Sequence, residues 1–114
     1  MTKKEIKQRA ARFVKFVEWS DEDQVFIGRC PTLFMGGCHG ADEAKVYAEL
    51  CQIVEEWIEI LEKDGTPLPE HDSKKFSGKF VLRLEPAMHH RLALKALATG
   101  ESLNSYCVKA LAKA

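Results

Sequence analysis

The sequence lacks the features that mark several large classes of protein. Among its 114 residues, no apolar run approaches the roughly 20 residues that a membrane-crossing helix requires. The basic N-terminal stretch MTKKEIKQRAAR has no apolar core of the kind found in secretory signals. Hydrophobic residues make up 46% and charged residues 30%, which is typical of a globular chain. We therefore expect one domain or two very small ones, in the cytoplasm and away from membranes.

The sequence also lacks a metal-binding cysteine motif. Zinc sites normally need four ligands at recognisable spacing, and the pair of Cys38 and His39 is too small a set. No two cysteines form a CxxC pattern, so we expect reduced thiols, no metal and no cofactor. The four cysteines are Cys30, Cys38, Cys51 and Cys107.

Acidic residues are scarce in the C-terminal part, although the net charge of the chain is zero. Residues 1–73 hold 9 Lys and Arg against 15 Asp and Glu, a net charge of −6. Residues 74–114 hold 8 against 2, a net charge of +6. An acidic part joined to a basic part predicts two surfaces with different partners, and the basic part is a candidate for nucleic acid.

The N-terminal half predicts three short strands. Arg12–Trp19 and Val25–Cys30 are rich in Val and aromatic residues and flank the polar turn SDEDQ, which predicts a hairpin. The stretch LFMGGCHG predicts a third short strand that closes into a loop. We expect Gly36, Gly37 and Gly40 to adopt backbone conformations that other residues resist.

Helical periodicity follows over Asp42–Lys63. Beside the main apolar stripe, Val46, Ile53 and Ile60 form a second one. A wide core face under a small sheet is one interpretation, and a second contact between dimers is the other. Acidic residues cover the remaining face, which is solvated by default but also suits a basic protein partner. They are Glu49, Glu55, Glu56, Glu59 and Glu62.

The polar segment Lys63–Gly78 is rich in Pro and Gly and predicts a linker, which we place at residues 70–78. A single short strand is predicted next, because apolar Phe80, Leu82 and Leu84 alternate with more polar or open positions. Two helices follow it. Pro86 begins the first helix, Gly100 ends it, and Ser102 is the N-cap of the second.

A lone strand leaves its backbone hydrogen bonds unmet, and a unit of under 40 residues buries too little core to be stable alone. Two chains that pair their strands antiparallel across a two-fold axis satisfy both requirements. The apolar strand residues then point into a shared core. The outward residues lie on a two-stranded ribbon that fits the major groove of DNA.

Residues 79–114 resemble the ribbon-helix-helix DNA-binding fold of the Arc and MetJ type repressors. The pattern G-x-S-x-N at Gly100–Asn104 is typical of the helix–helix junction of that fold. The resemblance implies that outward strand residues face bases, and that the start of the second helix holds a DNA phosphate through backbone N–H groups. The implied DNA-binding residues are Lys79, Val81, Arg83, Ser102, Leu103 and Asn104, and the implied dimer core is Phe80, Leu82 and Leu84.

Residues 13–114 as a whole resemble a HicB-family antitoxin, through the segments VEWSDEDQVFIGRCP, GCHG and WIEILEKDGTPLPE ahead of the ribbon-helix-helix tail. The resemblance implies an α+β chain with a partial RNase H-like βββα domain at residues 13–69, preceded by a basic segment at 1–12. That domain would bind and block HicA, a small basic toxin that cleaves mRNA. The domain at 79–114 would dimerise and repress the shared operon. The implied partners are operator DNA, a HicA-like toxin and a second copy, with a tetramer left open, and no enzymatic activity is implied.

Two other functions stay open. A metal-dependent nuclease needs several carboxylates that converge on two metals, whereas Glu18 and the turn acids Asp21–Asp23 cluster on one hairpin. A free-standing repressor whose N-terminal domain senses a small molecule or metal is the second alternative. A ligand that changed operator affinity would favour the repressor.

Overall fold

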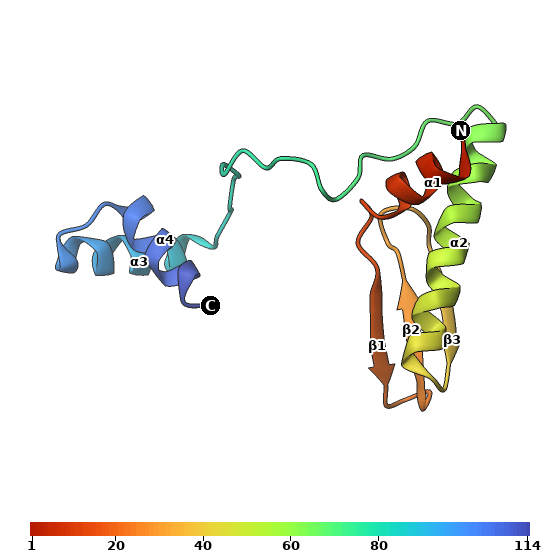
Figure 1. Ribbon diagram of the computed structural model, residues 1–114. Coiled ribbons are helices and arrows are strands. Elements are labelled where there is room, and N and C mark those ends of the chain that lie inside the picture. Colours follow the sequence, from red (N-terminus) through yellow and green to blue (C-terminus); the bar gives the residue numbers. More distant parts are fainter. The chain divides into compact units, whose positions relative to one another are not determined.

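The computed structural model describes residues 1–114, which divide into two units. We call residues 1–76 the front unit and residues 77–114 the back unit. The chain is α+β, with one three-stranded antiparallel sheet and four helices (Figure 1). None of these helices has both the length and the apolarity needed to cross a membrane. In chain order the elements are α1 (Lys3–Ala10), β1 (Phe16–Ser20), β2 (Val25–Arg29), β3 (Cys38–Gly40), α2 (Glu43–Lys63), α3 (Pro86–Thr99) and α4 (Leu103–Ala112).

The front unit contains the β-β-β-α order that the sequence predicts. Strand β2 lies in the centre of the sheet and pairs antiparallel with both β1 and β3. Val17 lies opposite Gly28, and Gly28 lies opposite Cys38, so the three residues share one face of the sheet. This face packs against α2, because a Cβ atom added to Gly28 would contact the side chain of Val46 on that helix.

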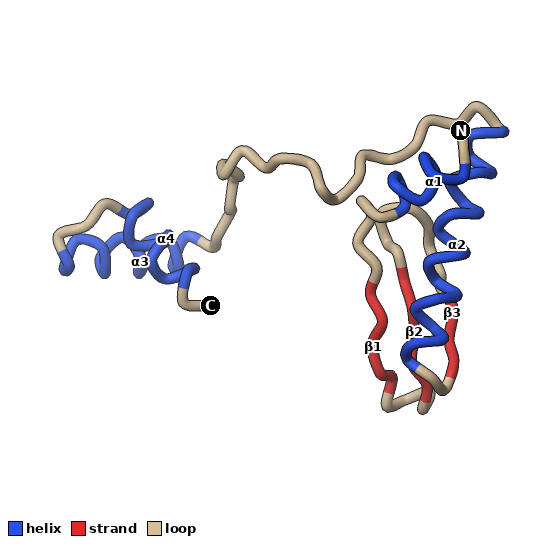
Figure 2. The backbone as a smooth tube through the Cα atoms, viewed as in Figure 1, coloured by secondary structure: helices blue, strands red, loops and turns tan.

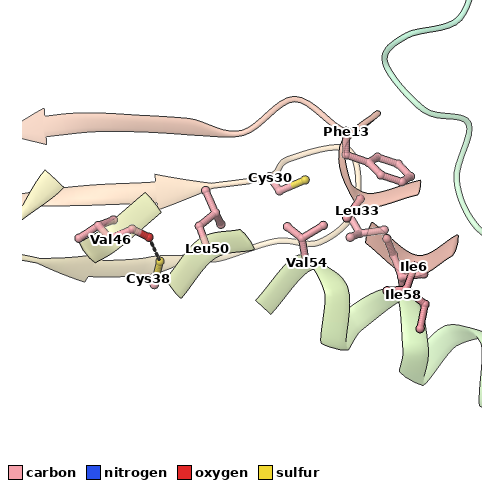
Figure 3. Packing of buried hydrophobic residues seen from close by; sticks show 10 residues of the cluster. Ile6, Phe13, Cys30, Leu33, Cys38, Val46, Leu50, Val54 and Ile58 are labelled. Atoms are coloured by element: carbon pink, nitrogen blue, oxygen red, sulfur yellow. Dashed lines mark hydrogen bonds between the residues drawn. The ribbon is translucent and has the colours of Figure 1, made fainter. Parts of the chain in front are cut away.

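Helix α2 supplies four of the ten buried residues in the core of the front unit (Figure 3). Its N-cap is Asp42, whose side chain accepts a hydrogen bond from the backbone N–H of Lys45 at 3.1 Å. Apolar residues recur at every fourth position, so they form one row that faces the sheet. These side chains are at most 1% exposed: Val46, Leu50, Val54 and Ile58.

Of the two interpretations of the second apolar stripe of α2, the structure supports the wide core face at Val46. This residue is 1% exposed, and its carbonyl oxygen accepts a hydrogen bond from the thiol of Cys38 (Figure 3). It is therefore closed to a second dimer contact, whereas Ile60 is exposed. The cause is the close approach of α2 to Gly28 and Gly40, where an added Cβ would lie 3.1 Å from a methyl group of Val46.

The basic N-terminal segment forms a helix, α1, that belongs to the front unit. Thr2 is its N-cap, and its side chain accepts a hydrogen bond from the backbone N–H of Glu5. Ile6, Ala10 and the following Phe13 are buried in the same core as α2. These three apolar positions therefore attach an otherwise charged segment to the domain.

The glycine loop before β3 is constrained in different ways at its three glycines. Gly36 has a φ angle of +88°, so the predicted backbone conformation is confirmed there. At Gly37 and Gly40 the constraint is space instead. A Cβ atom on Gly37 would lie 2.0 Å from the carbonyl oxygen of Gly28, and one on Gly40 would press on Val46.

Residues 64–85 contain no helix or strand (Figure 2). The first part of this stretch is hydrogen-bonded to the rest of the front unit. The carboxylate of Asp72 accepts hydrogen bonds from the backbone N–H of Val14 and from the hydroxyl of Thr32, both at 2.8 Å. These bonds, the one from Val14 first, hold the pKa of Asp72 below its usual value. The predicted linker is therefore attached to the front unit as far as Ser73, whose hydroxyl donates to the carbonyl oxygen of Arg12.

The back unit consists of α3, α4 and the extended residues before them. The predicted helix boundaries are confirmed. Pro86 is the first residue of α3, and Gly100 follows its end with a φ angle of +72° in the left-handed region. Ser102 is the N-cap of α4, and its side chain accepts a hydrogen bond from the backbone N–H of Ser105 at 3.1 Å.

The loop before β3 generates a stability prediction. The substitution Gly37→Ala should lower the free energy of unfolding by about 2 kcal/mol or more, because the added Cβ displaces the backbone of β2. Gly65→Ala is the matched control. Gly65 has a φ angle of +69° but no atom within 4 Å of an added Cβ, so its cost should be about 1 kcal/mol. Urea unfolding followed by tryptophan fluorescence measures both, and equal costs would contradict the close approach at Gly37.

Candidate functional site

Residues 79–84 of the back unit, which the sequence predicts to form a strand, are all exposed. They adopt no regular structure, and the backbone of residues 80–84 makes no hydrogen bond within the chain. Neither the side chains predicted to face DNA nor the apolar ones contact a partner within the chain. Phe80 and Val81 are 78% and 82% exposed.

The two helices of the back unit also leave much apolar surface open. Ala96 is the one buried side chain in this unit, at 2% exposure. A folded domain rarely leaves so many large apolar side chains in water unless another surface covers them. The exposed ones are Phe80, Val81, Leu82, Leu84, Met88, Leu94, Leu97, Val108 and Leu111.

The first turn of α4 holds the residues expected at a DNA phosphate. Ser102 caps the helix through its side chain, so its hydroxyl is already an acceptor within the turn. The backbone N–H groups of Leu103 and Asn104 are among the first of the helix and have no acceptor within it. Such N–H groups, together with the helix dipole, form a site suited to a phosphate oxygen.

Positive charge dominates the surface of the back unit. Residues 77–114 contain six Lys and Arg against two Asp and Glu. One of the six, Lys109, is engaged in an ion pair with Glu101, which lowers the pKa of that carboxyl group. Lys79 and Arg83 form no ion pair, so their charges are available to a negatively charged partner.

The acidic turn of the front unit is held by local hydrogen bonds. The indole N–H of Trp19 donates to the carboxylate of Asp21 at 2.8 Å, and the carboxylate of Asp23 accepts from the hydroxyl of Ser20 at 3.4 Å. Glu18 forms an ion pair with Arg29 on the neighbouring strand. No three His, Cys, Asp or Glu side chains gather into a group that could hold a metal ion.

The cysteine and histidine at the third strand are separated by the sheet. Cys38 is buried toward α2, whereas His39 is exposed on the opposite face. Burial raises the pKa of the thiols of Cys30 and Cys38. All four cysteines are free thiols.

A groove lies on the face of the sheet away from α2, and it was not predicted from the sequence. Its volume is about 610 Å³, and half-buried Val25 and Ile27 form its apolar part. Arg29 and His39 contribute the polar part. The signal was present in the sequence, because Val25, Ile27 and Arg29 alternate with the residues that face the core. Its other lining residues are Asp23, Gly36, Gly37 and Cys38.

Comparison with known families matches residues 64–111 to the HicB family. The matched segment covers the linker, the predicted strand, α3 and nearly all of α4, which is less than half of the chain. It supports HicB-family membership through the C-terminal part of the sequence. No curated protein and no solved structure matches the chain.

Proposed function

We propose that this chain is the antitoxin of a toxin–antitoxin pair. The match of residues 64–111 to the HicB family suggests this role, and the motifs of the N-terminal half resemble the same family. In this proposal the front unit binds and blocks a small basic HicA-like toxin. The back unit forms a dimer, binds operator DNA and represses the shared operon.

The observation that carries the proposal is the open apolar surface of the back unit. Within one chain this unit buries a single side chain. The backbone of residues 80–84, which are predicted to form a strand, has no hydrogen-bond partner in the chain. Pairing with the same segment of a second chain supplies the missing backbone bonds and a shared core for Phe80, Leu82 and Leu84. A ribbon-helix-helix dimer has this arrangement, with Lys79, Val81 and Arg83 facing outward.

The front unit offers an acidic helix face to the toxin. Most of the acidic side chains of α2 are exposed, and Glu49, Glu56 and Glu59 lie off the buried row of the helix. A surface of one charge sign steers and orients a partner of the opposite sign. A partial RNase H-like fold agrees with the βββα order of this unit, although here it serves binding rather than cleavage.

A second candidate is a free-standing repressor whose front unit senses a small ligand. The groove of about 610 Å³ on the open face of the sheet favours this alternative, because its size and mixed lining suit a small molecule. The two functions differ in the partner of the front unit and agree on the back unit.

The test of the antitoxin proposal is recovery of the partner from native cells. The tagged full-length chain should recover a small basic protein in equal molar amount, identified by mass spectrometry. Reversing charge in the variant Glu56→Lys/Glu59→Lys should lower this recovery, because the proposed acidic face loses its attraction. The matched control Glu22→Lys/Asp23→Lys makes the same charge change at the hairpin turn and should recover the toxin normally. DNA without any protein partner would favour the repressor.

Paired strands generate a prediction about assembly. Phe80→Asp should leave the chain monomeric at concentrations where the wild type is a dimer, because the variant places a charge in the shared core. Phe76→Asp is the matched control. Phe76 and Phe80 are each 78% exposed within one chain, but Phe76 lies outside the predicted strand. Sedimentation equilibrium distinguishes the two variants, and a stable Phe80→Asp dimer would contradict the paired strands.

The outward face of the ribbon generates a prediction about DNA. Arg83→Ala should weaken operator binding by about 1–3 kcal/mol, as expected for loss of a bidentate contact to guanine. Arg83→Lys keeps the charge but cannot donate two parallel hydrogen bonds to guanine, so it should bind the operator nearly as weakly as Arg83→Ala does. Fluorescence anisotropy with the DNA upstream of the gene measures both. Normal binding by Arg83→Ala would mean that the strand is wrongly placed.

A further inference from the structure

A small cavity in the front unit lies between the end of α1 and the attached part of the linker. Its volume is about 240 Å³. Arg9 and Arg12 approach it from the α1 side and His71 from the linker side. Phe13, Leu68 and Pro69 complete its lining, so the cavity combines an apolar floor with three nitrogen-bearing side chains.

The two arginines at this cavity have no acidic partner. Neither Arg9 nor Arg12 takes part in any of the ion pairs of the chain, and no acidic side chain lines the cavity. The neighbouring Asp72 is committed elsewhere, because one carboxylate oxygen accepts from Val14 and the other from Thr32. Arg9 and Arg12 thus line the cavity as exposed side chains without an ion-pair partner.

The carbonyl groups at the end of α1 are also occupied. The ammonium group of Lys15 donates to the carbonyl oxygen of Ala10 at 2.9 Å, and the hydroxyl of Ser73 donates to that of Arg12 at 3.3 Å. A cation in the last turn of a helix is favoured by the helix dipole, which accounts for Arg9. The helix dipole does not account for the presence of His71 at the cavity, because His71 belongs to the linker.

His71 has an unsatisfied polar atom. Its Nδ1 is shielded from solvent and has no hydrogen-bond partner in the chain. Buried polar atoms in folded proteins nearly always have a partner, so an orphan of this kind calls for a ligand, a water or an ion. Because Nδ1 is shielded from solvent, the imidazole ring must rotate before this atom can donate to an anionic oxygen in the cavity.

The walls of the cavity are held in place before any ligand binds. Phe13 is buried, and Leu68 packs against the core of the front unit. Asp72 and Ser73 attach the linker immediately beyond His71. At about 240 Å³ the cavity is smaller than the roughly 300–1,000 Å³ of sites for drug-sized ligands, so it suits one small anion.

We propose that Arg9, Arg12 and His71 form a binding site for a single phosphate group. Guanidinium groups bind phosphate through charge-assisted, paired hydrogen bonds, and the imidazole adds a third donor. The bound phosphate joins α1 to the linker and so stabilises the attached state of residues 68–73. This site goes beyond the proposed antitoxin function and does not depend on it.

The test is a titration of the full-length, ¹⁵N-labelled chain with sodium phosphate at constant ionic strength, followed by amide NMR shifts. Saturable shifts should be confined to residues 9–13 and 68–73. In Arg9→Gln/Arg12→Gln the phosphate affinity should fall by about tenfold or more, since charge-assisted hydrogen bonds are lost. Lys3→Gln/Lys4→Gln removes the same charge from the same helix away from the cavity and should bind as the wild type does.

The source of the phosphate is distinguished by a 5′-phosphorylated dinucleotide in place of the free ion. Tighter binding with shifts at the same amides assigns the site to nucleic-acid phosphate, and equal affinity assigns it to the free anion. Unsaturable shifts, shifts spread over the basic back unit, or equal binding by the arginine variant would overturn the proposal. Unchanged shifts of the core amides show that each variant is folded.

Discussion

The backbone of residues 80–84 has no hydrogen-bond partner within the chain and lies among exposed apolar side chains, and our account of this protein depends on this constraint. Nothing in the chain pairs with this segment, and the apolar side chains around it are open to water. Helix caps at Gly100 and Ser102 define α3 and α4 well, but two helices of this size bury Ala96 alone. The back unit therefore has local structure but buries almost no core of its own, and we propose that a second chain supplies the missing core.

The front unit presents the opposite case. One helix and three strands close around a contiguous core, to which α1 adds Ile6 and Ala10. Gly28 and Gly40 allow α2 to approach the sheet closely, and Asp72 connects the linker to that framework. In the proposed dimer, the two back units would thus hold two folded front units on one DNA site. Two linked copies bind a pair of targets more tightly than separate copies do.

The sequence predicted those features that local chemistry decides. The caps of α3 and α4, the strand order and the helix over residues 43–63 follow from turn residues, N-caps and periodicity. Features decided by distant contacts were missed. Helix α1 looks like a charged segment because few of its residues are buried, and the attachment of Asp72 depends on Val14 and Thr32, far away in sequence. For Val46 the sequence left a core face and a dimer contact open, and the nearness of Gly28, which periodicity does not reveal, places this residue in the core.

Hydrogen exchange of the wild-type chain, measured as a function of protein concentration, tests the central claim most directly. Paired strands predict that alternate amides within residues 80–84, those that face the second strand, are protected, and that dilution toward monomer removes the protection. Residues 74–78, in the linker just before them, should exchange fast at every concentration and provide the internal reference. Fast exchange at residues 80–84 under conditions where the chain sediments as a dimer would contradict the claim, because the two copies would then meet through another surface.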